Sequence, residues 1–118
     1  MGGRLEAGTL AHKIVDLLSD KQAEDILLLD IRNVATFADY FVIASAQTVR
    51  QMEAILAALE EEVGKDGVQP LGREGAPDSG WVLLDLGDVI VHVFAPEERA
   101  YYDLEGLWHA ATPVVRIQ

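Results

Sequence analysis

Residues 81–94, WVLLDLGDVIVHVF, consist of two apolar runs that meet at a glycine. Gly87 can adopt a positive φ at no steric cost, so a two-residue turn at Gly87 and Asp88 predicts a β-hairpin. A loop of this length pairs odd-numbered residues of the first strand with even-numbered residues of the second. The hairpin therefore has two faces of different composition, and these faces decide how the sheet packs.

One predicted face of the hairpin is wholly aliphatic and suits packing against helices. The opposite face mixes aromatic, aliphatic and polar side chains, as the cores of protein interfaces do, and predicts a docking surface. A three-residue turn would instead move Trp81, Leu83 and Asp85 to the valine side. The aliphatic face consists of Val82, Leu84, Leu86, Val89, Val91 and Val93, and the mixed face of Trp81, Leu83, Asp85, Ile90, His92 and Phe94.

The rest of the chain alternates helical and strand patterns around this hairpin. Together they predict one domain over residues 1–118 with an α/β (α+β) fold, in which a small mixed sheet of about five strands has helices packed mainly on one face. After Pro113 the chain either adds a strand or lies free. The other predicted elements are a helix from Leu10 to Leu18 capped by Thr9, strands at 25–32 and 40–45, a helix over 47–65, an extended piece near Leu71 and a helix over 98–111.

The last predicted helix contains YYDLEGLW, residues 101–108, and also has two sides. Leu104, Leu107 and Trp108 form one helical stripe that can dock on the sheet. Tyr101 and Glu105 lie four residues apart and share another side. That second side is free to meet a partner beside the mixed face of the hairpin.

The charge of the chain favours a basic protein partner. The 118 residues include 20 acidic and 9 basic residues, which give a net charge of −11. Such a surface repels phosphate, so we expect no specific readout of nucleic acid. It attracts basic proteins, although solubility alone is an alternative explanation.

The sequence contains no cysteine. A disulfide or thiolate metal site is therefore excluded, and a reducing cytoplasmic compartment is expected. The N-terminal residues lack the apolar run of a signal peptide, and no apolar stretch is long enough to cross a bilayer. We expect a cytoplasmic protein without membrane contact.

An enzymatic alternative would use Asp30, Asp85 and Asp88 with a divalent metal, as nucleotidyltransferases do. Such chemistry needs two or three close carboxylates and a phosphate cradle. The sequence has no pair of carboxylates two residues apart on one strand and no glycine-rich phosphate loop. Ser45 and Thr48 are interpreted as caps of the long helix and not as nucleophiles. No catalytic residue, metal or cofactor is predicted.

Two long stretches carry a family resemblance: DIRNVATFADYFVIASAQTVRQMEAI, and REGAPDSGWVLLDLGDVIVHVFAPEERAYYDLEGLW. Between residues 30 and 108 the chain closely resembles the ribosomal silencing factor family, also called Iojap-related. ADYFVIAS, EG before WVLLDLGDVIVHVF, and R-x-Y-Y-x-LE-x-LW are specific in combination. Ala46 stands where the family commonly has glycine, which bears on the turn before the long helix.

The resemblance implies a protein without enzymatic activity that binds the large ribosomal subunit through its protein fourteen. Binding at the face that meets the small subunit would block subunit joining and lower translation when nutrients are short. The family is also linked to large-subunit biogenesis, and its members can form homodimers. The implied fold is similar to nucleotidyltransferases without their catalytic carboxylates.

We therefore expect a partner-binding patch on the mixed face of the hairpin and the following helix. Aromatic and aliphatic members would act as anchors, and carboxylates would pair with basic groups of the partner. The pattern does not divide the patch between ribosome and homodimer. It also leaves open that His92 lies in or beside the core and that Trp81 caps the edge of the sheet. The predicted anchors are Trp81, Leu83, His92, Phe94, Tyr102 and Leu104, and the predicted carboxylates are Asp85, Asp103 and Glu105.

Overall fold

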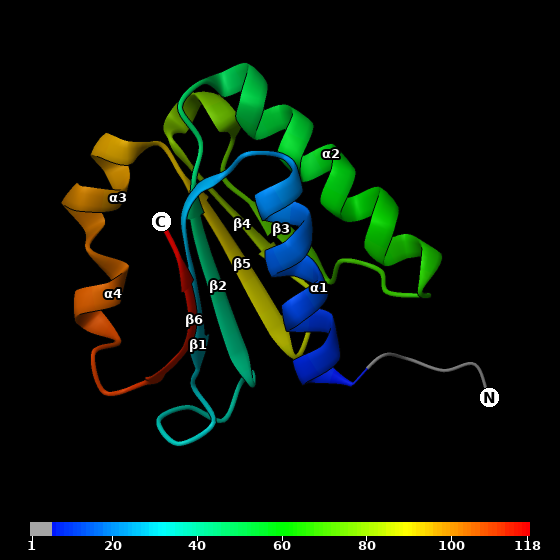
Figure 1. Cartoon of the computed structure of the whole chain (residues 1–118), viewed down its shortest axis with the longest axis vertical. Helices are drawn as coiled ribbons and strands as arrows, with labels where there is room; N and C mark the ends of the chain where they lie inside the picture. Colours follow the sequence, from blue (N-terminus) through cyan, green and yellow to red (C-terminus); the bar gives the residue numbers. More distant parts are fainter. Residues whose placement is uncertain (1–5) are drawn as a thin grey trace.

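The computed structural model describes residues 6–118 and contains both helices and strands (Figure 1). The first five residues of the predicted domain lie outside the described part. The elements are α1 (Ala7–Asp20), β1 (Glu24–Asp30), β2 (Tyr40–Ser45), α2 (Val49–Lys65), β3 (Gly72–Glu74), η1 (Pro77–Ser79), β4 (Trp81–Asp85), β5 (Val89–Phe94), α3 (Pro96–Tyr102), α4 (Leu104–Leu107) and β6 (Thr112–Ile117).

The hairpin forms with the predicted turn and register. Strands β4 and β5 pair antiparallel, and odd-numbered residues of β4 lie opposite even-numbered residues of β5. The amide of Leu86 donates a hydrogen bond of 3.0 Å to the carbonyl of Val89. This bond closes a two-residue turn in which Gly87 has a φ of 92°. The glycine is needed there because other residues rarely adopt that conformation.

The strands form one mixed sheet in the order β3-β4-β5-β2-β1-β6. Strands β2 and β5 pair in parallel, whereas the other neighbours are antiparallel. The α/β prediction is confirmed, but the sheet has six strands and not about five. The additional strand is β6, in which Val114, Val115 and Ile117 supply the β-branched residues that suit a strand. Of the two alternatives for the C-terminal residues, the added strand is the correct one.

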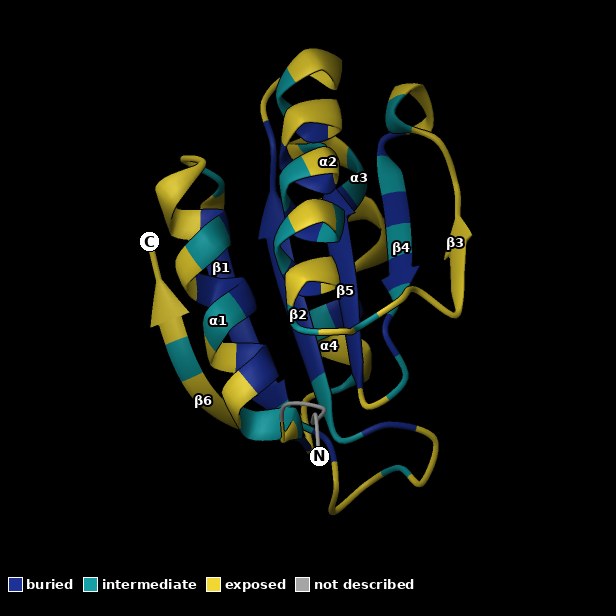
Figure 2. Ribbon diagram, turned by 90° about the vertical axis from the view of Figure 1, so that its right-hand side faces the viewer, coloured by how far each residue is buried: buried dark blue, intermediate teal, exposed yellow. Residues whose placement is uncertain are grey.

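One face of the sheet packs against the two long helices, α1 and α2 (Figure 2). The aliphatic face of the hairpin is buried here throughout, as predicted. It is joined by apolar residues of β1 and β2 and by the inner stripes of both helices. This first core contains no aromatic residue among its fully buried members.

The other face is covered by α3 and α4, so the prediction of helices mainly on one face holds only for the long ones (Figure 1). A second core forms beneath the short helices. It includes Phe41 and Phe94 and is packed from outside by Trp81 and Trp108. The mixed face of the hairpin is therefore largely internal.

The ends of the two long helices differ in how they are capped. Helix α2 begins as expected after Thr48, whose hydroxyl accepts a hydrogen bond of 3.0 Å from the amide of Gln51. Ser45 is not a cap, because it ends β2 and is buried. The Thr9 cap is also wrong, since α1 follows Glu6 without a side-chain cap.

The helix predicted over residues 98–111 is broken into α3 and α4. Asp103 separates them in a left-handed conformation with a φ of 47°. Its carboxylate accepts a hydrogen bond of 3.2 Å from the amide of Gly106 and so caps α4. Aspartate tolerates this conformation better than most residues, because its short side chain bonds to nearby backbone. The break turns α4 and places Leu104 in the second core.

Candidate docking site

An aromatic groove opens between β4, the loop before it and the end of α3. Trp81 and Leu83 of β4 and Tyr102 of α3 supply its apolar walls. The groove encloses about 280 Å³. The indole of Trp81 lies 4.7 Å from the ring of Tyr102, centroid to centroid. The full lining of the aromatic groove is Glu74, Gly75, Ser79, Trp81, Leu83 and Tyr102.

The loop of residues 75–80 shapes one end of the aromatic groove. Gly75 has a φ of 86°, and a Cβ at this position would overlap the carbonyl oxygen of Trp81. The loop can therefore approach β4 closely only with glycine here. The hydroxyl of Ser79 donates a hydrogen bond of 2.7 Å to the carbonyl of Ala76, which holds the single turn η1 together.

Trp81 is fixed from beneath by aromatic neighbours. Its indole stacks on Phe94 at 4.9 Å between ring centroids. Its Nε1–H donates a hydrogen bond of 3.2 Å to Nδ1 of His92. His92 exposes only 3% of its surface, and this burial lowers the pKa of its imidazole to about 4. The imidazole is therefore neutral near pH 7 and able to accept the bond.

The structure divides the predicted anchors into accessible and internal residues. Trp81 and Leu83 are half-buried, and Tyr102 is 45% exposed. These three line the aromatic groove together. The other three predicted anchors, His92, Phe94 and Leu104, are buried in or beside the second core. Their predicted role as surface anchors is wrong, because α3 and α4 cover the sheet face on which they lie. They instead support the aromatic groove from within.

The three predicted carboxylates are already engaged within the chain. Asp85 accepts a hydrogen bond of 2.8 Å from the amide of Gly87 and stabilises the hairpin turn. Glu105 accepts two bonds from Arg99. Asp103, which is exposed, caps α4. The edge strand instead supplies a carboxylate to the groove, since Glu74 pairs with Leu83 across β3 and β4.

Leu107 is also misplaced by the single-helix prediction. It was expected to dock on the sheet but is 74% exposed. Trp108 does dock, with its ring 4.8 Å from Phe41 and 5.8 Å from Phe37 between centroids. Helix α4 ends at Leu107, so Trp108 does not continue the helical spacing on which the predicted common stripe depends.

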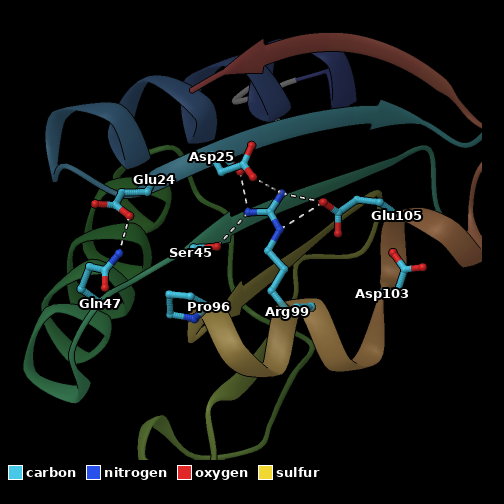
Figure 3. A pocket seen from close by; sticks show the side chains of 9 residues that line it. Glu24, Asp25, Ser45, Gln47, Pro96, Arg99, Asp103 and Glu105 are labelled. Atoms are coloured by element: carbon cyan, nitrogen blue, oxygen red, sulfur yellow. Dashed lines mark hydrogen bonds and ion pairs between the residues drawn. The ribbon is translucent and has the colours of Figure 1, made fainter.

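A buried arginine ties α3 to the sheet in a second hollow, of about 340 Å³ (Figure 3). Arg99 is only 6% exposed. Its Nη1 donates to the hydroxyl of Ser45 at 2.9 Å and to the carbonyl of Asp25 at 2.5 Å. Its Nε and Nη2 donate to one carboxylate oxygen of Glu105 at 3.1 and 2.9 Å. The partners come from β1, β2 and α4, so Arg99 joins four elements.

Known proteins resemble this chain over most of its length. The family model described as "Ribosomal silencing factor during starvation" matches residues 4–118. The chain belongs to the ribosomal silencing factor family. A ribosomal silencing factor of Bacillus subtilis is 46% identical over 89 residues, which cover 75% of each chain. The chloroplastic Iojap protein of Zea mays is 31% identical over 109 residues, which cover 92% of this chain and 47% of that protein.

A solved structure supports the same ribosomal silencing factor fold. The crystal structure of a protein from Chromobacterium violaceum superposes with a TM-score of 0.85 at 31% sequence identity. The match covers 97% of this chain and 95% of that one. Membership of the ribosomal silencing factor family places the chain among ribosome-associated regulators of translation. Within residues 6–118, no helix is both long and apolar enough to cross a membrane.

Two of the three carboxylates of the enzymatic alternative, Asp30 and Asp85, are not brought together. Asp30 ends β1 and Asp85 ends β4, and β2 and β5 lie between these strands. Three strand spacings separate them by about 14 Å, too far for one metal ion. Asp30 is bound instead by Arg32, whose hydrogen bonds hold the pKa of that carboxyl below its usual value. Among the described residues, no three His, Asp or Glu side chains are grouped to hold a metal.

Proposed function

We propose that the chain silences ribosomes by binding protein fourteen of the large subunit and blocking the approach of the small subunit when nutrients are limiting. Such activity takes place in the cytoplasm and needs no catalytic residue. The observation that supports the proposal is the aromatic groove, an accessible apolar hollow beside a carboxylate on a chain of net charge −11. Family membership favours the ribosome as the assembly that this surface binds.

The chemistry of the aromatic groove suits a basic protein. Aromatic side chains that are partly buried before binding are typical interface anchors, because little conformational freedom is lost when they are covered. Trp81 and Tyr102 have this character. The carboxylate of Glu74 beside them suits a lysine or arginine of a ribosomal protein. The net negative charge speeds encounter with a basic protein and disfavours direct contact with RNA phosphates.

Steric exclusion is a sufficient mechanism for silencing. The molecule measures about 42 by 31 by 24 Å. A body of this size on the face of the large subunit that meets the small subunit occupies space that the small subunit needs. Repression then depends only on the fraction of large subunits that carry the protein, and it ends when the protein dissociates.

A homodimer is part of the same proposal. Within the described residues, no strand pairs with the outer edge of β6. The strand also exposes Val114 and Ile117. Unpaired strand edges readily take up another strand, so a second copy can add to this one. Strand β6 forms one edge of the sheet, and β4 lies next to the opposite edge. Such a dimer therefore leaves the aromatic groove free. Light scattering across a concentration series measures the oligomeric state.

The binding surface is tested by Trp81→Ala, with Leu71→Ala as the matched control. Leu71 is 76% exposed and lies beside Leu86, on the sheet face that α1 and α2 cover. Loss of a central aromatic anchor costs about 2 to 4 kcal/mol. We therefore expect Trp81→Ala to bind purified protein fourteen more than tenfold more weakly, whereas Leu71→Ala binds like the unaltered protein.

Circular dichroism and thermal melting accompany both titrations, so that loss of binding is separated from loss of fold. Tyr102→Ala provides a second variant, because its side chain is largely outside the cores. Equal affinity of Trp81→Ala, Tyr102→Ala and the unaltered protein would contradict the assignment of the aromatic groove. Absence of binding by the unaltered protein would contradict the partner itself.

A further inference from the structure

His92 is a buried polar residue whose hydrogen bonding is incomplete. It is 3% exposed and packs against Phe41, with ring centroids 4.9 Å apart. Its Nδ1 accepts the hydrogen bond from Trp81, whereas its Nε2 has no partner. A buried donor without a partner lowers stability, so packing alone does not explain a histidine here.

The bond to Trp81 determines the tautomer of the imidazole. The Nε1–H of an indole can only donate, so Nδ1 of His92 must be the acceptor. A neutral imidazole then carries its proton on Nε2, the atom that has no partner. Burial holds the pKa of His92 at about 4 and keeps this neutral form at ordinary pH. The unpaired Nε2–H is thus the consequence of offering an acceptor to Trp81.

We propose that His92 is a positioning residue for docking: it orients the indole of Trp81 in the wall of the aromatic groove at the expense of stability. The inference rests on the proposed function of that groove. Stacking on Phe94 and contact with Tyr102 keep the indole in place but tolerate sliding and tilting of the ring. The hydrogen bond to Nδ1 is directional, and it selects one ring orientation before the partner arrives.

Two substitutions separate positioning from packing. His92→Leu fills the site with an apolar side chain and removes both the acceptor and the unpaired donor. His92→Asn keeps an acceptor near the position of Nδ1. We expect His92→Leu to melt at the same or a higher temperature than the unaltered protein. Its affinity for purified protein fourteen should fall about three- to tenfold, the range expected when an interface side chain must be ordered on binding. His92→Asn should recover part of that loss.

Hydrogen exchange of the indole Nε1–H in NMR spectra measures whether the hydrogen bond that orients Trp81 is formed. The chain has two tryptophans, and Trp108→Phe assigns the two signals. In the unaltered protein the Trp81 signal should exchange slowly, because its hydrogen is bonded to a buried nitrogen. The signal should exchange faster in His92→Leu and be slowed again in His92→Asn. A residue that only fills space would not give this pattern.

The binding and melting of His92→Leu distinguish a positioning role of His92 from a structural one. If His92→Leu binds as tightly as the unaltered protein, the positioning role is wrong while the proposed function stands. If His92→Leu melts at a clearly lower temperature or fails to fold, His92 is a structural residue and the inference is overturned. If the unaltered protein does not bind protein fourteen, the proposed function is wrong and the docking role falls with it.

Discussion

The two faces of one hairpin differ in what they bury. The face toward α1 and α2 is aliphatic from Val82 to Val93. The face toward α3 and α4 buries aromatic rings together with His92, and α3 itself carries a buried arginine, Arg99. The first face follows the rule that apolar side chains fill a core, whereas the second departs from it.

The difference indicates that the two faces of the sheet have different roles. Buried polar groups are retained at a cost, and they concentrate where a protein needs defined geometry more than stability. His92 supports the indole of Trp81, and Arg99 holds α3, which carries Tyr102. Both therefore lie behind a wall of the aromatic groove. The first face stabilises the fold, and the second shapes the surface.

The largest expected effect is a loss of stability on the first face. Leu84 is fully buried there, and Leu84→Ala should reduce the free energy of unfolding by about 4 kcal/mol. Its neighbour Leu83 is half-buried on the second face, and Leu83→Ala should cost about 1 kcal/mol. Urea denaturation followed by circular dichroism measures both. Comparable losses for the two leucines would remove the distinction between the faces.

An effect of intermediate size is expected from acid. The unfolded chain protonates His92 near pH 6.5, whereas burial keeps the pKa of the folded state at about 4. Between these values the unfolded state binds more protons, so stability falls as the pH is lowered, by about 3 kcal/mol in all. His92→Leu lacks this contribution. Urea midpoints measured from pH 7 to pH 4.5 should decline less steeply for the variant, and parallel curves would refute the burial of a neutral imidazole.

A smaller effect is expected at the arginine that joins α3 to the sheet. Arg99→Met removes hydrogen bonds to a charged group and should reduce the free energy of unfolding by about 2 kcal/mol. Arg116, whose side chain is 45% exposed, pairs with Asp25 and provides the control. Arg116→Met should change stability by less than about 0.5 kcal/mol. Hydrogen exchange at α3 should quicken only for Arg99→Met, and equal effects of the two variants would contradict the role of Arg99.

The parts of the fold that depend on local periodicity were predictable from the sequence. Alternation in β4 and β5, together with Gly87, was enough to predict the turn, the register and the aliphatic face. Helix α2 followed from its apolar stripe and from Thr48. The proximity of Trp81 and Tyr102 was predictable because the hairpin and α3 are adjacent in the chain.

The parts that depend on distant contacts were not predictable. Ser45 and Asp25 bind Arg99 across 54 and 74 residues, so no local pattern marks the arginine. No local sequence pattern marks the break at Asp103 either, because the apolar spacing on both sides is helical. The composition of the mixed face predicts a surface position for Phe94, but α3 and α4 bury this residue. The strand β6 had a signal in its β-branched residues, but its partner β1 lies far away in the sequence.

We propose that the protein, bound to the large subunit through the aromatic groove, keeps the two ribosomal subunits apart. The most direct measurement mixes isolated large and small subunits with increasing amounts of the protein and separates them by gradient centrifugation. We predict that the protein sediments with the large subunit, that whole ribosomes decrease in proportion, and that excess small subunit displaces it. Trp81→Ala should leave subunit joining intact. Whole ribosomes that form normally while carrying the protein would contradict the account.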